Sequence, residues 1–175
     1  MTATARPSDP PAPTPPADRT PENVVRWTFD VLNSHQSAPL RAVWTDETLE
    51  RFPTATYRGA DEIAGYFDRL FVAVPDVALT MLALAADGEN VFVRWRITGT
   101  HTGGELEGIV PTGARLDLDG VDHFVVRDGT IASNFVIFDQ MQFARQLGLL
   151  PADGSRTDVG LKYAFNALTR WRGRH

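Results

Sequence analysis

Two hydrophobic periodicities divide the sequence, a helical one before residue 75 and an alternating one after it. In the first part apolar residues recur about every 3.6 positions, as on one face of an α-helix. Thr20 and Pro21 open the first such stretch with the residue types of an N-cap and of a first helical position. The spacing predicts helices over 21–34, 38–44 and 60–74. It also predicts a strand over 49–57, which Pro53 interrupts.

From residue 77 on, apolar and polar residues alternate, which is the pattern of half-buried β-strands. Glycine-containing turns separate these stretches, at Asp87-Gly88, Gly103-Gly104, Pro111-Thr112-Gly113 and Asp128-Gly129. The pattern predicts strands over 77–85, 91–101, 115–126 and 131–139, a further strand after Gly104, and helices over 140–148 and 158–171. Helices followed by an antiparallel meander predict an α+β fold. We expect a cone-shaped, curved antiparallel sheet wrapped around the N-terminal helices, with an extra C-terminal helix.

Side chains alternate between the two faces of a strand, so register decides which residues of 115–126 face the inside of the cone. One face is apolar except for Asp122, which is accompanied by Leu116, Leu118, Phe124 and Val126. Burial disfavours a charged carboxylate and raises its pKa, which suits it to take up and return a proton near neutral pH. The alternative is a structural aspartate that only accepts hydrogen bonds.

Other candidates are placed less firmly by the same argument. Trp95 shares a face of 91–101 with His101, so Trp95 is a predicted pocket wall. His101 is either a polar group of the pocket or an edge histidine of the following turn. Both faces of 131–139 are apolar, so register does not place Asn134. Tyr66 lies on an apolar helix face, where aromatic residues more often belong to the core than to a ligand site.

Composition narrows the classes of function. The net charge of -5 argues against nucleic-acid binding, and the absence of cysteine excludes disulfides and thiolate chemistry. The four histidines have no metal-ligand spacing, so we expect neither a metal ion nor another cofactor. No stretch has the length of a membrane span, and no signal peptide is recognisable, so a cytoplasmic location is expected. Residues 1–20 are rich in proline and are expected to be disordered.

A family resemblance rests on GTHTGGELEGIVPTGARLDLDGVDHFVVRDGTIASNF, which begins at Gly99, and on FDQMQFARQLGLLP, which ends at Pro151. These motifs resemble the SnoaL-like polyketide cyclases of the nuclear-transport-factor-2-like superfamily. The likeness extends more weakly to RFPTATYRGADEIAGYF. It predicts a tail over 1–20, a SnoaL-like domain over 21–151 and a helical extension over 152–175.

The resemblance implies a homodimer or a homotetramer, of which we expect the dimer. It also implies metal-free aldol ring closure of polyketide intermediates, as in antibiotic biosynthesis. It also implies that the aspartate on the strand after PTG acts as general acid and base, which is Asp122 here. Relatives with cyclase activity pair this acid with a histidine of the preceding strand region. The matching segment 105–108 of this chain contains none.

Three functions are therefore compared. In the first, a cyclase or isomerase acts on an apolar polyketide-like substrate through Asp122, and His101 or Asn134 polarises the carbonyl. The predicted wall of its pocket consists of Trp95, Phe124, Phe135, Phe52 and Tyr66. The second function is an epoxide hydrolase, which needs Arg94 or Arg96 inside the pocket. The third is a non-catalytic module that binds a small molecule or dimerises.

Overall fold

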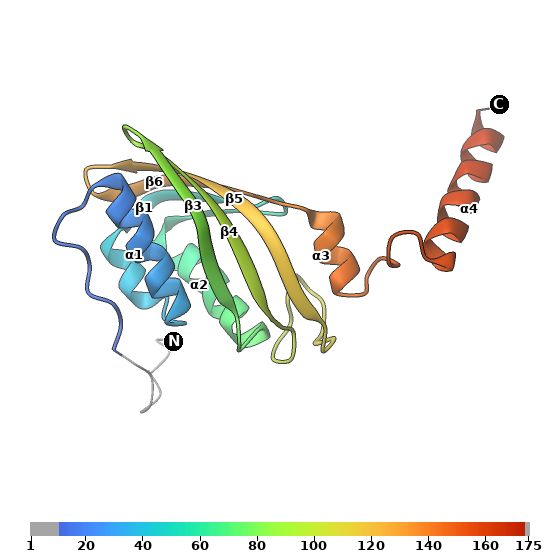
Figure 1. Ribbon diagram of the computed structural model, residues 1–175, viewed down its shortest axis with the longest axis horizontal. Coiled ribbons are helices and arrows are strands. Elements are labelled where there is room, and N and C mark those ends of the chain that lie inside the picture. The colour runs from blue at the N-terminus through green and yellow to red at the C-terminus, as the bar shows by residue number, and fades with distance from the viewer. Residues whose placement is uncertain (1–10, 174–175) are drawn as a thin grey trace.

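The computed structural model describes residues 11–173, which form an α+β fold around a six-stranded, curved and unclosed sheet (Figure 1). The strand order is β2-β1-β6-β5-β4-β3. The strands are β1 (Trp44–Arg51), β2 (Thr56–Arg58), β3 (Ala78–Asp87), β4 (Asn90–Thr100), β5 (Arg115–Arg127) and β6 (Thr130–Phe138). The helices are α1 (Pro21–Asn33), the 3-10 helix η1 (Ala38–Ala42), α2 (Gly59–Ala73), α3 (Gln140–Gln146) and α4 (Arg156–Arg172).

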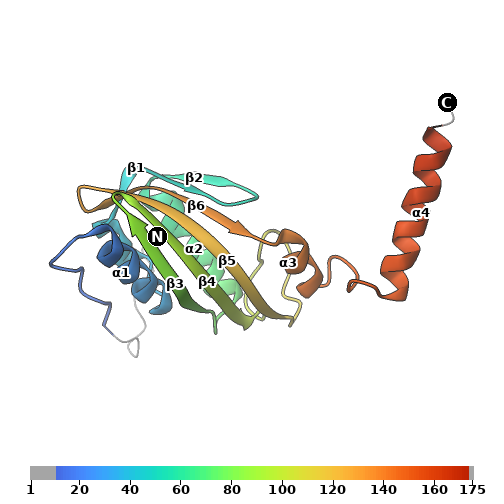
Figure 2. The ribbon, with the colours of Figure 1, turned by 45° about the horizontal axis from the view of Figure 1, so that its top comes forward.

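Helices α1 and α2 pack against the concave side of the sheet, as the expected cone requires (Figures 1 and 2). Helix α1 begins at Pro21, whose fixed φ suits a first helical position, although the Thr20 side chain makes no capping hydrogen bond. One face of α1 is buried, including Val24, Val31 and Leu32. Each such side chain stabilises the fold by roughly 1.5–3 kcal/mol. The two helices therefore cover the concave face of the sheet.

Strands β3 to β6 form the antiparallel meander that the alternation predicts. The expectation of a wholly antiparallel sheet is wrong at one pair, because β1 lies parallel to β6. Parallel pairing needs a long connection between the strands. Helix α2 and the four strands β2 to β5 supply that connection. The pairing places Glu50 beside Asn134 in register.

The predicted strand after Gly104 does not form. Residues 101–114 make a loop with a single bridge between Leu106 and Ile109. The reason lies in the glycines: the amides of Gly103 and Gly104 donate to carbonyls at the end of α2, at 3.0 and 3.1 Å. A Cβ on Gly103 would lie 1.7 Å from the carbonyl oxygen of Val72, so only glycine allows this approach.

Two predicted elements differ in extent. The strand predicted over 49–57 is two strands, β1 and β2, joined by a short turn that contains Pro53. The helix predicted over 38–44 is a 3-10 helix that ends at Ala42, and β1 begins at Trp44. Exposed polar residues at 45–47 interrupt the alternation of β1, so the alternating pattern predicts only the second half of this strand.

Two described segments flank this arrangement, residues 11–20 and the C-terminal helix. Of the tail predicted over 1–20, residues 1–10 lie outside the described part, and residues 11–20 contain no helix or strand. The predicted C-terminal helix is confirmed as α4, which projects away from the sheet (Figures 1 and 2). Ser155 caps it by accepting a hydrogen bond from the Asp158 amide at 3.2 Å. No helix within residues 11–173 is both long enough and apolar enough to cross a membrane.

Candidate functional site

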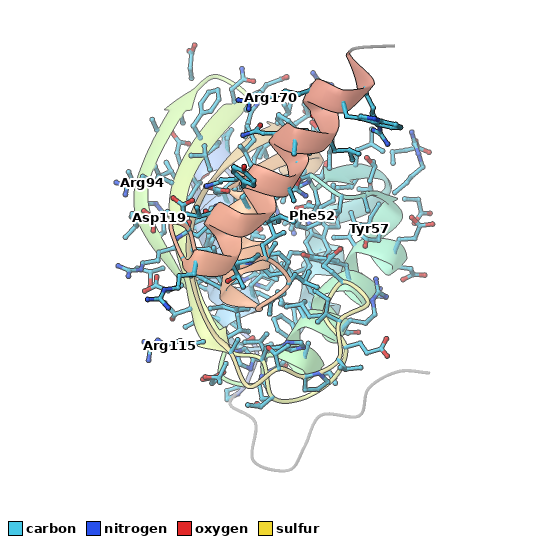
Figure 3. All side chains as sticks on the ribbon, turned by 90° about the vertical axis from the view of Figure 1, so that its right-hand side faces the viewer. Phe52, Tyr57, Arg94, Arg115, Asp119 and Arg170 are labelled. Carbon is cyan, nitrogen blue, oxygen red and sulfur yellow. The ribbon has the colours of Figure 1, made fainter. Side chains whose placement is uncertain are left out.

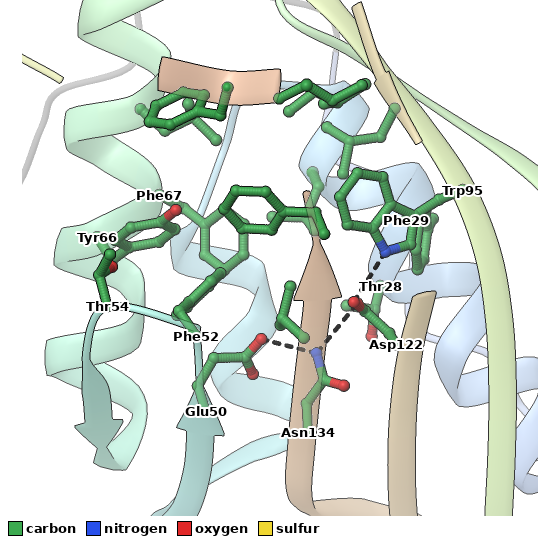
Figure 4. A pocket seen from close by; sticks show the side chains of 18 of the residues that line it. Thr28, Phe29, Glu50, Phe52, Thr54, Tyr66, Phe67, Trp95, Asp122 and Asn134 are labelled. Carbon is green, nitrogen blue, oxygen red and sulfur yellow. Dashed lines mark hydrogen bonds between the residues drawn. The ribbon is translucent and has the colours of Figure 1, made fainter. Parts of the chain in front are cut away.

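A cavity of about 110 Å³ lies between the concave face of the sheet and helices α1, α2 and α3. Most of its wall is apolar and aromatic, including Phe29, Phe67, Trp95, Phe124, Phe138 and Phe143. Three polar side chains on neighbouring strands face it together: Glu50 on β1, Asn134 on β6 and Asp122 on β5 (Figure 4). Within residues 11–173, no group of three or more His, Asp and Glu side chains is placed to hold a metal ion.

Asp122 is nearly inaccessible to solvent, with a relative exposure of 7%. Its Oδ1 accepts a hydrogen bond from the indole Nε1 of Trp95 at 2.8 Å, and its Oδ2 accepts one from Nδ2 of Asn134 at 3.1 Å. Burial raises the pKa of Asp122 to about 6, and the hydrogen bonds from Trp95 and Asn134 oppose this rise. The carboxylate is therefore mostly charged at neutral pH, yet more basic than an exposed one.

The position of Trp95 depends on a glycine of the adjacent strand. Trp95 on β4 pairs with Gly120 on β5, two residues before Asp122. A Cβ on Gly120 would lie 2.2 Å from the indole ring. The ring therefore lies where a side chain of β5 would otherwise be, and this position lets its N–H reach the neighbouring carboxylate.

Glu50 is the site residue that the sequence analysis missed. Its side chain is buried, and its Oε1 accepts a hydrogen bond from Nδ2 of Asn134 at 2.7 Å (Figure 4). Burial, and next the negative charge of Asp122, raise the pKa of Glu50 to about 8, whereas the Asn134 hydrogen bond lowers it. A signal was present, because Thr48, Glu50 and Phe52 alternate along the chain and the last was already a predicted pocket residue.

The family assignment comes from comparison with known proteins. The model of the SnoaL-like polyketide cyclase family matches residues 22–147. This chain belongs to that family. No curated protein matches the sequence significantly.

Solved structures show the same SnoaL-like fold. TsrD of Streptomyces laurentii is 24% identical, with a TM-score of 0.66 over 74% of this chain and 95% of its own. A protein of Jannaschia described as a SnoaL-like polyketide cyclase is 21% identical, with a TM-score of 0.68 over 75% and 93%. IdmH of Streptomyces antibioticus, described as a polyketide cyclase, is 23% identical, with a TM-score of 0.61 over 73% and 98%.

The SnoaL-like cavity brings together most of the predicted site residues. Asp122 lies at its wall with Trp95 and Asn134, and Phe124 flanks it on the same strand. Phe52 and Tyr66 line the opposite side, with ring centroids 4.2 Å apart. The Tyr66 hydroxyl has a pKa raised above its usual value, chiefly by burial.

Two predicted site residues lie elsewhere. His101 is fully buried, but it is held within the loop by the Gly104 carbonyl, 2.9 Å from Nε2, and by the Thr112 hydroxyl, 3.3 Å from Nδ1. It does not line the cavity, and both of its ring nitrogens have partners in the loop rather than Asp122. Phe135 lies on the outer face of β6, beneath the Arg51 guanidinium, whose carbon is 4.8 Å from the ring centroid. It too is no part of the wall.

The arginines of β4 do not line the cavity. Figure 3 shows Arg94 beside Asp119 on the outer side of the sheet. Arg94 pairs with Asp119 at 2.7 Å and Arg96 with Asp117 at 2.5 Å, all on the outer face. Among the described residues that line the cavity there is no lysine, arginine or histidine. The arginine-containing arrangement that an epoxide hydrolase would need is therefore not formed around Asp122.

Proposed function

We propose that this SnoaL-like protein transfers a proton at the carbon next to a carbonyl group of an apolar, polyketide-like substrate, with Asp122 as general base. The resulting enol then closes a ring by intramolecular aldol addition or isomerises. The observation that carries this proposal is a buried carboxylate with a pKa of about 6 at the wall of an aromatic cavity. A base of this strength is largely ionised at neutral pH and removes protons more readily than an exposed aspartate does.

Two features of the cavity support the role of Asp122. The hydrogen bonds from Trp95 and Asn134 orient both carboxylate oxygens, so that the base approaches the substrate in one direction. The aromatic wall fits a flat, apolar ring system and excludes water from the base. A purely structural aspartate would more often be satisfied by backbone amides, whereas both partners of Asp122 are side chains that also line the cavity.

The proposal is tested with a small aromatic ketone, α-tetralone, dissolved in deuterium oxide. The protein should accelerate exchange of the ketone's α-protons, followed by proton NMR. Asp122→Asn should lower the protein-dependent exchange rate by about 100-fold or more, as expected for loss of a general base. Asp119→Asn, on the outer face of the same strand, is the matched control and should exchange at the parental rate. Unchanged exchange in Asp122→Asn would contradict the assignment and favour a non-catalytic binding module.

We also propose that the protein assembles as a homodimer. Apolar side chains gather on the outer face of the sheet, where Phe92, Val121 and Ile137 of three successive strands are 46%, 41% and 52% exposed. Such patches commonly mark association surfaces. Light scattering of the full chain tests this, and a monomeric mass at micromolar concentration would refute it.

A further inference from the structure

A second carboxyl group, that of Glu50, faces the cavity from the other side of Asn134 (Figure 4). The amide nitrogen of Asn134 donates to Oε1 of Glu50 at 2.7 Å and to Oδ2 of Asp122 at 3.1 Å. One amide group therefore bridges two carboxyl groups that come from strands on either side of β6. The two acids are held at one place in an otherwise apolar wall.

The second carboxyl oxygen of Glu50 differs from the first in its hydrogen bonding within the described part of the chain. Among the described residues, Oε2 of Glu50 and Oδ1 of Asn134 are buried and have no hydrogen-bond partner. Buried polar atoms are nearly always paired, because leaving one unpaired is unfavourable. Since Glu50 is 2% exposed and lines the cavity, a substrate in the cavity is the partner that this oxygen can reach.

The charges around the site decide which acid keeps a proton. Among the residues that the structure describes, the titratable side chains that line the cavity are Glu50, Asp122, Tyr66 of α2 and Glu107 of the loop, and none of them is a cation. Two carboxylates bridged by one amide, without a cation, are unfavourable when both are charged. Asp122 receives two hydrogen bonds that favour its charged form, and Glu50 receives one. The negative charge therefore belongs on Asp122 and the proton on Glu50, which agrees with pKa values of about 6 and about 8.

We infer that Glu50 is a second catalytic residue, the general acid that protonates the substrate carbonyl oxygen while Asp122 removes the proton from the adjacent carbon. This inference rests on the proposed function and deepens it. It also defines the substrate class: a ketone whose carbonyl oxygen points at Oε2 of Glu50 and whose α-hydrogen points at Asp122.

The proton balance closes over one turnover. The α C–H bond breaks and its proton passes to Asp122, while the O–H proton of Glu50 passes to the carbonyl oxygen, which leaves a neutral enol and a Glu50 carboxylate. When the enol carbon attacks the second carbonyl, the new C–C bond forms and the enol O–H proton returns to Glu50. Asp122 then gives its proton to the new alkoxide oxygen. Both residues regain their starting states, and one hydrogen has moved from carbon to oxygen.

Two probe reactions separate the acid from the base. Exchange of the α-protons of α-tetralone needs both a base and a proton donor to the carbonyl. Ring opening of nitrobenzisoxazole, followed by absorbance, needs the base, because its leaving group is a stable nitrophenolate. Glu50→Gln should lower the exchange rate by about 100-fold and change the ring-opening rate by less than about threefold. Asp122→Asn should lower both rates.

The matched control is Glu47→Gln, a change on the same strand at a side chain that is 88% exposed and paired with Arg58. It should leave both rates at the parental values. A pH profile supplies an independent readout: exchange by the parental protein should fall as the pH rises past about 8, and this alkaline limb should be absent in Glu50→Gln. Glu50→Asp should restore part of the exchange, because it again offers a carboxyl proton.

The outcomes distinguish the two proposals. Parental exchange in a folded Glu50→Gln would overturn the role of Glu50 and leave Asp122 as the base. If Glu50→Gln does not fold, the absence of the alkaline limb in the parental protein overturns the role equally. A parental rate of ring opening in Asp122→Asn would overturn the proposed function itself. A parental protein that accelerates neither reaction would overturn both.

Discussion

The two faces of β5 carry the same residue type in opposite surroundings. Asp122 on the inner face is 7% exposed, and burial raises the pKa of its carboxyl group. Asp117 on the outer face accepts hydrogen bonds from the Arg96 guanidinium, and these are the main cause that holds the pKa of its carboxyl group below the usual value. The two residues are five positions apart on one strand, so an odd separation puts them on opposite sides. The face that an aspartate occupies, rather than its identity, therefore decides whether it can act as a base near neutral pH.

The faces also differ in what holds them together. The inner face combines aromatic packing with side-chain hydrogen bonds to buried acids. Removing one partner of such a bond leaves the other buried without a partner, which is unfavourable. The outer face is crossed by ion pairs whose side chains are between 37% and 60% exposed. Water and salt screen such pairs, so each adds little to the stability. Changes inside should therefore have large effects, and changes outside should have small ones.

The largest expected effect concerns pH and the buried Glu50. Its folded-state pKa of about 8 exceeds the unfolded value near 4.5, so the folded protein holds a proton that the unfolded chain releases. The stabilisation that this bound proton provides is fully present below the unfolded pKa and is lost as the pH rises to about 8. The free energy of unfolding changes by an amount on the order of 5 kcal/mol. Glu50→Gln should remove this loss, so the variant should be more stable than the parent at about pH 9.

Urea unfolding at about pH 5 and about pH 9 measures the effect. Asp117→Asn is the outer-face counterpart and should show the parental difference between these two pH values, because the lowered pKa of Asp117 stabilises the fold above its unfolded value of about 3.8 and the contribution is lost only as the pH falls below that value. If the parent and Glu50→Gln lose equal stability between the two pH values, Glu50 does not carry a buried proton.

The next largest effect on stability is expected where Gly120 of β5 lies against the Trp95 ring of β4. Gly120→Ala places a methyl group 2.2 Å from the Trp95 ring, so the ring must move. We expect a loss of about 1–3 kcal/mol in the free energy of unfolding, typical of overpacking. Urea denaturation measures it. Gly160→Ala in α4, where a Cβ meets nothing within 4 Å, is the control and should lose no stability. An equal loss at both positions would argue against the close packing of Trp95.

A smaller effect tests the hydrogen bond to the base. Trp95→Phe removes the indole N–H that lowers the pKa of Asp122, so this pKa should rise further above about 6. A hydrogen bond to a charged group is worth about 1.5–3 kcal/mol, which corresponds to a rise of about one to two pKa units. Carbon NMR of labelled carboxyl groups follows the titration. Phe92→Leu, on the outer face of the same strand, should leave it unchanged.

The smallest effect on stability is expected on the outer face of the sheet. Asp119→Asn removes the ion pair with Arg94, whose side chain is 60% exposed, and should change the stability by less than about 1 kcal/mol. Thermal unfolding in low and high salt measures it, and the difference from the parent should shrink as salt screens the pair. A loss comparable to that of Gly120→Ala would mean that the outer face contributes far more than its exposure indicates.

Local periodicity was enough to predict which way the side chains of one strand and of one helix point. The alternation along 115–126 placed Asp122 among Leu116 and Phe124, and the strand pairing confirms that face. The helical spacing likewise placed Tyr66 on a buried stripe. These results need only the geometry of one strand or one helix, in which side-chain direction repeats with a fixed period.

The hydrogen-bond partners of Asp122 depend on contacts between distant segments of the chain. Glu50 and Asn134 meet because β1 pairs with β6 in parallel, across 84 residues of chain, and no local pattern encodes that pairing. His101 has the strand register of an inward residue, yet the loop closes over it and satisfies both of its nitrogens. Local periodicity thus determines which way a side chain points. Contacts between distant segments determine what it meets there, because they depend on the packing of the whole sheet against its helices.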